Sequence, residues 1–405
     1  MKIANVVRRF VFGEWGGTES AVWNLSKQFA KFGHIPEILA TSALDKNGSE
    51  ARDGISIARY PYFYPYLMLD PKAKTVLDKK GGNPFSFGLY KHIKNGGFDI
   101  VHSHTLGRTS KIALLAARKT GVPCVLSFHG GYSDVPKSES ESMLEPTRRS
   151  LGYGAAIEEI FGMRKDAVAE SDGIICVGEN EYERVRKLFP RKPIALIPNG
   201  VDFEKFSATP HSDFRKEYSI PKDRELILCV SRIDTQKNQS ALLDLLDVLV
   251  SNGRNAHLAL VGFITNESYF NRIIEKAQFL GLSDRLTVCD GLPPDSDMLV
   301  SAYKSADVFA LASIHEPFGI VVLEAWAAGV PVIAANVGGL GRLVKDGESG
   351  FLFNPHDTKQ TVKAYIDAVK FSEKTKSAAA EICRKNYSWE AVARQTLLFY
   401  NSLKK

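Results

Sequence analysis

The sequence predicts an α/β protein with two similarly built Rossmann-like domains. Strand-like runs alternate with helical runs along almost the whole chain, which is typical of parallel sheets with crossover helices. This alternation runs through twice, over a comparable length each time. At 405 residues the chain also exceeds the length at which one hydrophobic core stops growing. We therefore expect two successive βαβ domains facing a central cleft.

The first domain is expected over residues 1–202, closed by the turn signal Pro198–Asp202. A helix should run from about Thr18 to Phe32. The aromatic stretch Tyr60–Leu69 holds two prolines, so it is either a buried connection or an apolar surface that meets a lipid or acceptor. The polar insertion Ser133–Pro146 follows a strand and is a candidate lid. The expected strands read KIANVV, IPEILAT, FDIVHSH, PCVLSF, GIICVG and PIALIP.

The second domain is expected over residues 203–386, where the same pattern restarts. Its expected strands read ELILCVS, AHLALVG, RLTVCDG, DVFALAS and PVIAA. The five cysteines include no CxxC pair, and four of them lie inside strand-like segments. They are interpreted as small buried side chains in a reducing compartment, not as metal ligands or disulfides.

The net charge of +6 is concentrated in the first half of the chain. Residues 1–200 carry 28 Lys and Arg against 21 Asp and Glu, and the remainder is nearly neutral. This excess favours an anionic partner, such as a phosphorylated acceptor or a membrane surface, although a solvated basic surface would explain it equally well. No signal peptide and no membrane-spanning run is recognisable, so we expect a cytoplasmic protein that could be peripheral at the inner face of a membrane.

The most informative stretch is Ser313–Gly329, SIHEPFGIVVLEAWAAG, in which Glu316 and Glu324 flank a helix start. Pro317 suits the first turn of a helix, and Gly319 lets a ligand approach the exposed N–H groups, which bind anions. Eight helical residues would span about 12 Å, roughly the distance between the ends of a nucleotide sugar. The stretch is therefore interpreted as a donor clamp. The alternative is a buried helix whose Glu324 merely pairs with a neighbour.

Two cations follow the strand ELILCV at its carboxyl end. Arg232 and Lys237 belong to the segment SRIDTQKN and would project toward the cleft. A guanidinium and an ammonium together suit a diphosphate whose negative charge grows as it departs. The alternative is a pair of surface cations.

Other candidate positions are less specific. Gly16 and Gly17 lie between the first strand and first helix and permit close approach of a phosphate or sugar, or form a turn with Thr18 as helix cap. His129 ends a buried-looking strand, where a histidine is more often structural than catalytic. His102 and His104 alternate on FDIVHSH, but no third metal ligand is evident. Asp295-Ser296-Asp297 opens a helix, which explains its acidic residues without a metal.

Taken together, these motifs resemble the retaining family 4 glycosyltransferases, which have the GT-B fold. The resemblance extends over nearly the whole chain in the family's order. It rests on HEPFGIVVLEAWAAG as an E-x7-E signature, together with Gly16-Gly17, SRIDTQKN, VGF at Val261–Phe263, PNGVD at Pro198–Asp202 and the closing YSWEAVARQTLLFY.

The resemblance implies roles for individual residues. Glu316 would hold donor-sugar hydroxyls, Glu324 the ribose, and Arg232 with Lys237 the diphosphate. His129 would lie between donor sugar and acceptor. The remaining implied contacts to the donor come from Gly16, Gly17, Gly262, Phe318, Gly319, Ile320 and Val321. Residues 387–405 would form a helix that crosses back and packs on the first domain.

The implied activity is retaining, metal-independent transfer of a hexosyl group from a nucleotide-diphosphate sugar, UDP- or GDP-linked, to a hydroxyl of a carbohydrate or lipid-linked acceptor. No cofactor and no nucleic-acid partner are expected. The setting would be envelope polysaccharide, glycolipid or glycoside biosynthesis. The alternatives are a same-fold nucleotide-sugar epimerase or phosphorylase, and a non-catalytic sugar- or lipid-binding protein.

Overall fold

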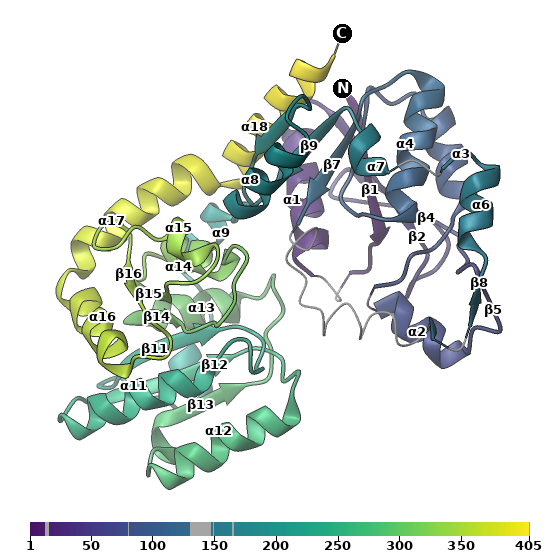
Figure 1. The fold of residues 1–405 in the computed structure, drawn as a ribbon. Helices are drawn as coiled ribbons and strands as arrows, with labels where there is room; N and C mark the ends of the chain where they lie inside the picture. Colours follow the sequence, from purple (N-terminus) through teal and green to yellow (C-terminus); the bar gives the residue numbers. More distant parts are fainter. Residues whose placement is uncertain (13–15, 80, 130–146, 149, 164–165, 405) are drawn as a thin grey trace. The chain divides into compact units, whose positions relative to one another are not determined.

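The structure is a computed structural model that describes residues 1–12, 16–79, 81–129, 147–148, 150–163 and 166–404. The chain divides into two compact units (Figure 1). The first consists of Met1–Asn199 with Val392–Lys405, and the second of Gly200–Ala391. The last helix, α18 (Trp389–Leu403), therefore begins in the second unit and ends in the first.

The first unit contains an eight-stranded sheet, a separate two-stranded ribbon and the helices that connect them. Its elements in chain order are β1 (Lys2–Arg9), α1 (Gly17–Lys31), β2 (Ile35–Thr41), β3 (Gly48–Arg52), β4 (Ile55–Tyr60), β5 (Tyr66–Leu67), α2 (Pro71–Lys79), α3 (Phe87–Asn95), β6 (Ile100–Ser103), α4 (Arg108–Thr120), β7 (Cys124–Phe128), β8 (Leu151–Gly152), α6 (Gly154–Ile160), α7 (Ala167–Glu170), β9 (Gly173–Cys176), α8 (Glu179–Leu188) and β10 (Ile194–Leu196).

The second unit contains a six-stranded sheet, and all of its neighbouring strands are parallel. Its elements are α9 (Phe203–Ser207), α10 (Phe214–Glu217), β11 (Glu225–Val230), α11 (Gln239–Ser251), β12 (Ala256–Val261), α12 (Glu267–Phe279), η2 (Ser283–Arg285), β13 (Leu286–Cys289), α13 (Asp297–Ser305), β14 (Val308–Leu311), α14 (Ile320–Ala328), β15 (Val332–Ala335), α15 (Leu340–Leu343), β16 (Phe351–Phe353), α16 (Thr358–Lys370), α17 (Ser372–Ile382) and η3 (Cys383–Tyr387).

Both sheets reverse their strand order once. The first has the order β10-β9-β7-β6-β1-β2-β4-β3, so the chain builds outward from β1 in one direction and from β6 in the other. The second has the order β13-β12-β11-β14-β15-β16, with the reversal between β11 and β14. Ligands of open α/β sheets bind outside the carboxyl ends of the strands at such switch points.

Each sheet is buried on both faces, which explains its nearly continuous apolar strands. In β11, Leu226 and Leu228 belong to one apolar cluster, and Ile227 and Cys229 belong to another on the opposite face. In β2, Leu39 likewise belongs to one apolar cluster, and Ile38 and Ala40 belong to another on the opposite face of the sheet. All five cysteines are free and buried, as predicted from the lack of a CxxC pair and, for four of them, from their strand-like surroundings.

The predicted fold class is confirmed, and every strand listed from the sequence is present. Several strands escaped prediction. β3 is exposed along its whole length and therefore lacks an apolar pattern, and β16 has only three residues. β5 and β8 pair as a two-residue ribbon that no local pattern announces. Within the described residues, none of the helices has the length and apolar character that crossing a bilayer would require.

Gly262, directly after β12, lies close to the backbone of Ser231 in the loop after β11, and we expect that only glycine fits at this position. Its φ is 154°, and a Cβ there would lie 1.9 Å from the Ser231 carbonyl oxygen. We predict that Gly262→Ala lowers the free energy of unfolding by about 2 kcal/mol or more, because both the backbone and Ser231 must shift. Gly253→Ala is the matched control, since Gly253 also has a positive φ of 81° but open space around it.

Chemical denaturation of both variants would check this prediction. The control should lose about 1 kcal/mol, from backbone strain alone. Equal losses for the two variants would contradict the steric argument.

Candidate functional site

An ion pair lies across the switch point of the second sheet. Lys237 is in the loop after β11, and Glu316 is in the loop after β14, the two strands on either side of the reversal. Lys237 Nζ lies 2.6 Å from Glu316 Oε2, and the two side chains are only 14% and 12% exposed. A charged pair this well shielded interacts more strongly than one on the surface. The structure thus brings together two of the predicted site residues.

Backbone hydrogen bonds fix the two loops to each other beside this pair. The Ile314 N–H donates to the Gln236 carbonyl at 2.8 Å. The Gln236 side-chain amide donates to the His315 carbonyl at 3.1 Å. Lys237 and Glu316 each follow directly after one of these bonded residues, so their side chains are directed by backbone geometry as well as by their mutual attraction.

A pair of glycines after β15 supports the Glu316 loop. The Gly339 N–H donates to the Glu316 carbonyl at 2.8 Å. A Cβ at Gly338 would lie 2.4 Å from that same carbonyl oxygen, and one at Gly339 would lie 2.1 Å from the Pro317 oxygen. The close approach therefore requires both glycines.

The helix after Glu316 begins later than the sequence predicted. α14 begins at Ile320, with Gly319 as N-cap at φ 95°, so Pro317 lies in a bend before the helix and the prediction that it occupies the first turn is wrong. The left-handed Gly319 makes the sharp entry that a proline-led turn would not need. The first turn of α14 still leaves backbone N–H groups without intrahelical acceptors, as an anion site requires.

Glu324 lies within α14 and is oriented by a tyrosine from α13. The Tyr303 hydroxyl donates to Glu324 Oε2 at 2.6 Å. Burial raises the pKa of Glu324, whereas the hydrogen bond from Tyr303 and the positive charge of Lys205 act in the opposite direction. Glu324 therefore does pair with a neighbour, as the structural alternative supposed, but one carboxylate oxygen is not bonded to Tyr303.

Arg232 is more exposed than Lys237. Its side chain is 52% exposed, and its Nη2 lies 3.4 Å from Asp234 Oδ2. Asp234 also accepts the Lys237 backbone N–H at 3.1 Å, so one carboxylate contacts both halves of the loop. Next to it, Gly262 packs its backbone on Ser231, which keeps the end of β12 against the start of the Arg232 loop.

A buried histidine cluster occupies the switch point of the first sheet. His104 follows β6 and His129 follows β7, and His104 Nδ1 lies 3.1 Å from His129 Nε2. His102, within β6, bonds to Ser127 Oγ at 2.7 Å and to the Tyr400 hydroxyl of α18. The ring centroids of His102 and His104 are 3.8 Å apart. His102 and His104 thus lie together, as their alternation suggested, and His104 also contacts a third histidine, His129.

Burial keeps these histidines neutral. It lowers the pKa of His129 to about 4 and that of His102 to about 3, and it lowers the pKa of His104 well below its usual value. Because folding lowers each pKa, the cluster favours the native state above pH 6.5. This stabilisation is lost as the pH falls from 6.5 toward 4, because protons then bind the unfolded state more readily than the native one.

Gly16 and Gly17 begin α1, and an acidic side chain contacts them. Gly16 is the N-cap, so the alternative that had Thr18 as the helix cap places the cap two residues too late. The Gly16 N–H donates to Glu19 Oε2 at 3.1 Å. The neighbouring Gly13–Trp15, the glycines 130–131 and the candidate lid Ser133–Pro146 lie outside the described residues.

Two side chains of the Asp295-Ser296-Asp297 motif accept hydrogen bonds from backbone N–H groups. Ser296 caps α13 by accepting the Leu299 N–H, and Asp297 Oδ2 accepts the N–H groups of His211 and Ser212 at 2.9 and 2.6 Å. In the described ranges, no group of three or more His, Cys, Asp or Glu side chains is arranged to hold a metal ion.

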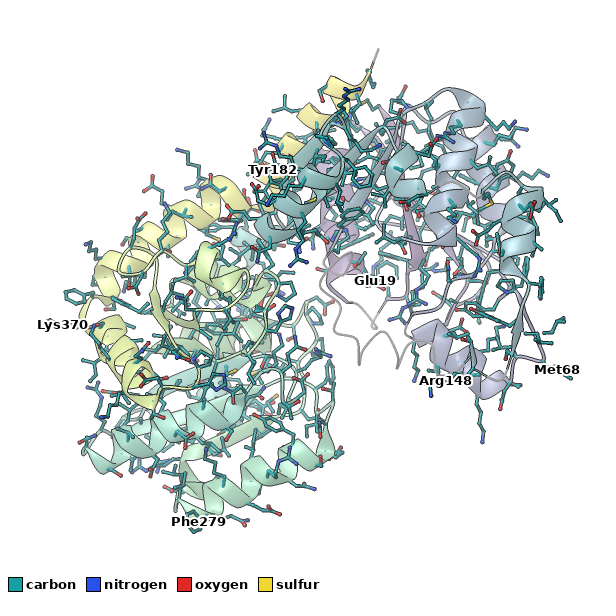
Figure 2. All side chains as sticks on the ribbon, viewed as in Figure 1. Glu19, Met68, Arg148, Tyr182, Phe279 and Lys370 are labelled. Atoms are coloured by element: carbon teal, nitrogen blue, oxygen red, sulfur yellow. The ribbon has the colours of Figure 1, made fainter. Side chains whose placement is uncertain are left out.

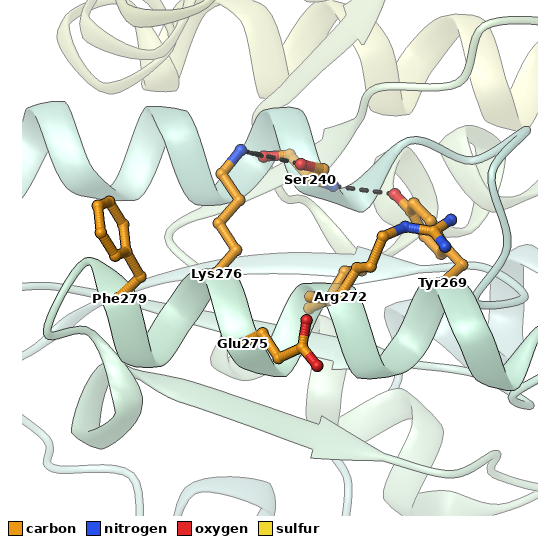
Figure 3. Close-up of a pocket in the computed structure, with 7 residues that line it drawn as sticks. Ser240, Tyr269, Arg272, Glu275, Lys276 and Phe279 are labelled. Carbon is orange, nitrogen blue, oxygen red and sulfur yellow. Dashed lines mark hydrogen bonds between the residues drawn. The ribbon is translucent and has the colours of Figure 1, made fainter.

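A pocket of about 470 Å³ lies between α11 and α12, and none of the predicted site residues lines it (Figure 3). Its polar groups are largely satisfied by each other. Lys276 Nζ donates to the Ser240 carbonyl and hydroxyl at 3.0 and 2.9 Å, and the Tyr269 hydroxyl accepts the Ser240 N–H. At its outer end, Phe279 is 89% exposed (Figure 2). The exposed Arg272 and Glu275 complete the polar part of its lining.

Sequence reasoning missed the supporting residues of the second switch point. Tyr303 and Lys205 lie on other helices, and no local motif marks them. Gly338 and Gly339 could have been found, because a glycine pair directly after the strand PVIAA is the same signal that drew attention to Gly16 and Gly17.

Two family models together match most of the chain. The model described as "Glycosyltransferase Family 4" matches residues 15–205, and "Glycosyl transferases group 1" matches residues 211–385. Among curated relatives, the D-inositol 3-phosphate glycosyltransferase of Rhodococcus jostii is 29% identical over 96% of this chain and 85% of its own length. That of Mycolicibacterium vanbaalenii is 30% identical over 75% of this chain and 67% of its own.

Solved structures have the same fold. A glycosyltransferase from Rickettsia africae superposes with a TM-score of 0.70 at 21% identity, covering 99% of this chain and 98% of the other. Anabaena HepE in complex with UDP and glucose gives a TM-score of 0.69 at 17% identity, covering 99% and 100%. With the two parallel sheets and the family matches, these likenesses lead to one conclusion. The chain belongs to the family 4 glycosyltransferases and is a glycosyltransferase with the GT-B fold.

Proposed function

We propose that the chain transfers a sugar, with retention of configuration, from a UDP- or GDP-sugar to a hydroxyl acceptor. The observation that carries this proposal is the Lys237–Glu316 pair at the switch point of the second sheet. A donor of this kind has a hydroxylated sugar joined to a diphosphate. Its sugar hydroxyls need a hydrogen-bond acceptor and its diphosphate needs a cation nearby. Glu316 and Lys237 supply this combination.

Each candidate site residue of the second unit has a role in this proposal. Arg232 and Lys237 bind the diphosphate and stabilise the charge that develops as it leaves. Glu316 accepts hydrogen bonds from the sugar hydroxyls. Glu324, oriented by Tyr303, accepts those of the ribose. The backbone from Phe318 to Val321 lies along the sugar and phosphates at the positive end of α14, and Gly262 lets the donor approach the sheet.

The proposed reaction breaks the bond between the anomeric carbon and the diphosphate oxygen and forms a bond to the acceptor oxygen on the same face. The acceptor hydroxyl loses its proton to the departing diphosphate. His129 contacts the sugar or the acceptor, and Gly16 and Gly17 lie near a phosphate or the acceptor. No metal is essential, because two side-chain cations neutralise the leaving group.

Two rival functions are distinguishable by their products. A nucleotide-sugar epimerase or a glycosidic phosphorylase of the same fold would need no hydroxyl acceptor, whereas transfer consumes one. A non-catalytic sugar- or lipid-binding protein would bind the donor without consuming it. The family matches to glycosyltransferases support transfer.

The first acceptor to test is a phosphorylated polyol. The relatives are named for D-inositol 3-phosphate, and the first half of this chain carries the excess of basic residues. Envelope polysaccharide and lipid-linked acceptors remain the alternatives, and a specific surface of the first unit supports contact with a membrane.

That surface is the tip of the β5–β8 ribbon, where large apolar side chains face solvent. Met68, Leu151 and Leu67 are 92%, 73% and 55% exposed. Leu67 pairs directly with Leu151, and Met68 and Arg148 lie at the same end of the unit (Figure 2). The exposed Lys72 and Lys74 follow in α2. Apolar residues beside cations favour an anionic lipid surface, where each cation contributes about 1 kcal/mol.

We predict that Lys237→Ala and Glu316→Ala each reduce kcat/KM for sugar transfer by about 100- to 1000-fold, equivalent to roughly 3–4 kcal/mol of transition-state stabilisation. The measurement is steady-state kinetics with an NMR assignment of the product anomer. Arg254→Ala is the matched control, because it breaks the 2.7 Å ion pair with Glu225 at the opposite end of β11.

The control should change stability but not the rate per folded molecule. Near-normal transfer by Lys237→Ala would exclude the proposed donor site, and an inverted product would exclude retention.

We also predict that transfer continues in excess chelator at the untreated rate. Thermal shifts with UDP, GDP and ADP, measured at equal concentration with chelator present, should identify the base, because the nucleotide that binds most tightly raises the apparent stability most. Complete loss of both activity and nucleotide binding in chelator, restored by a divalent cation, would overturn the metal-independent mechanism.

For the ribbon surface, we predict that the protein sediments with anionic phosphatidylglycerol vesicles at low salt and not with phosphatidylcholine vesicles. The double variant Met68→Ser/Leu151→Ser should reduce binding about tenfold or more, because the exposed apolar area is removed. Phe279→Ser, which removes an equally exposed aromatic group from the second unit, should leave binding unchanged. Absence of binding to anionic vesicles in low salt would rule out this contact.

A further inference from the structure

A chain of buried polar groups runs from α1 to the carboxyl end of β7 in the first unit. It starts at the Val22 carbonyl, which accepts the Ser26 hydroxyl at 2.7 Å. The next contacts join Ser26 Oγ to Asn5 Nδ2 at 3.1 Å and Asn5 Oδ1 to His104 Nε2 at 3.3 Å. The last joins His104 Nδ1 to His129 Nε2 at 3.1 Å. Ser26, Asn5 and His104 are buried and His129 is half-buried. Water therefore has little access to these contacts, and the positions of the hydrogens determine one another.

Ser26 sets the direction of the chain. Its single hydroxyl hydrogen is donated to the Val22 carbonyl, a backbone oxygen that can only accept. Ser26 Oγ must therefore accept from Asn5, which requires the NH₂ group of that amide to face Ser26. The carbonyl oxygen of the Asn5 amide then faces His104. The hydroxyl of Ser26 thus determines the orientation of the Asn5 amide.

The orientation of the Asn5 amide determines which nitrogen of His104 carries the hydrogen. Asn5 Oδ1 is an acceptor only, so His104 Nε2 must carry the hydrogen. Burial lowers the pKa of His104 well below its ordinary value, so the ring is neutral and holds only that one hydrogen. Its Nδ1 therefore presents a lone pair to His129, and His129 Nε2 must be the donor.

His129 is left with one unused acceptor. Burial lowers its pKa to about 4, with Asn199 offsetting part of the effect, so this ring too is neutral. With the hydrogen on Nε2, His129 Nδ1 has a lone pair. That atom is buried and no partner meets it at hydrogen-bonding geometry in the part of the chain that the structure describes, although the Asn199 side chain also interacts with the His129 ring. It lies at the carboxyl end of β7, beside the switch point where such sheets bind ligands.

We propose that His104 is a positioning residue that holds His129 in the Nε2–H tautomer, so that His129 Nδ1 accepts a hydrogen bond from a hydroxyl of the bound sugar or acceptor. The identity of the ligand as a sugar rests on the proposed function. The tautomer gives the position its selectivity. A neutral Nδ1 attracts a hydroxyl hydrogen and repels a phosphate oxygen, whereas the opposite tautomer would do the reverse.

The direct test is two-bond ¹H–¹⁵N correlation spectroscopy of histidine-labelled protein at pH 7.5, which reports the protonated nitrogen of each ring. The expected result is a single His129 tautomer with hydrogen on Nε2. His104→Leu should release this constraint and give His129 signals averaged between tautomers. His102→Leu is the matched control, because His102 lies in the same strand and is equally buried but makes no hydrogen bond to His129.

In the wild type, a charged His129, or one with its hydrogen on Nδ1, would overturn the proposal. Averaged His129 signals in His102→Leu but not in His104→Leu would overturn it as well. If His104→Leu does not fold, Ser26→Ala replaces it. That variant leaves both histidines in place and removes the group that orients Asn5, so it should also introduce the second His129 tautomer. An unchanged tautomer in Ser26→Ala would contradict the relay.

A kinetic arm connects the tautomer to the ligand. His104→Leu should raise KM for its substrate roughly five- to tenfold, the value of one neutral hydrogen bond. This effect should disappear with whichever monodeoxy substrate analogue lacks the hydroxyl that His129 contacts. An equal effect with every analogue would overturn the proposal. The spectra need no substrate, so absence of transfer with every donor would count against the proposed function alone.

Discussion

The second unit depends on one electrostatic constraint, the pairing of Lys237 with Glu316 across the reversal of its sheet. Two shielded charges of opposite sign stabilise each other, and removing either leaves the other buried without a counter-charge. The pair therefore holds the β11 and β14 loops in a fixed relation before a donor arrives. In the proposed donor complex, the diphosphate would compensate Lys237 and the sugar hydroxyls would compensate Glu316 for any weakening of this pair.

The two switch points are built with different polarity. In the second sheet the converging side chains are charged, whereas in the first the three histidines are neutral because burial lowers the pKa of each. Charged groups suit a diphosphate, and neutral acceptors suit hydroxyl groups. The two sheets are of the same type, but their switch points differ in polarity. This difference in polarity arises from the side chains at the ends of β6, β7, β11 and β14 and not from the sheets themselves.

The sequence revealed the strands and the residue types at their carboxyl ends, because buried parallel strands have a strong apolar signal and polar residues after them stand out. It could not reveal how those residues are held. Tyr303 contacts Glu324 from another helix, and Asn5 contacts His104 across nearly a hundred residues. Such partners are set by packing. The start of α14 was also misplaced, since Pro317 has the local preference for a first turn but the Gly338–Gly339 backbone occupies the space beside it.

Glu324 shows why a shielded carboxylate can serve as a ribose contact. Burial alone would favour its neutral form, and the hydrogen bond from Tyr303 with the charge of Lys205 only partly reverses this effect. Two ribose hydroxyls donating to the carboxylate would favour the ionised form further, since hydrogen bonds to a charged group stabilise it. In the proposed donor site, ribose hydroxyls would therefore act in the same direction as Tyr303 and Lys205, against the effect of burial on the pKa of Glu324. Nucleotide binding would then stabilise the carboxylate that recognises the ribose.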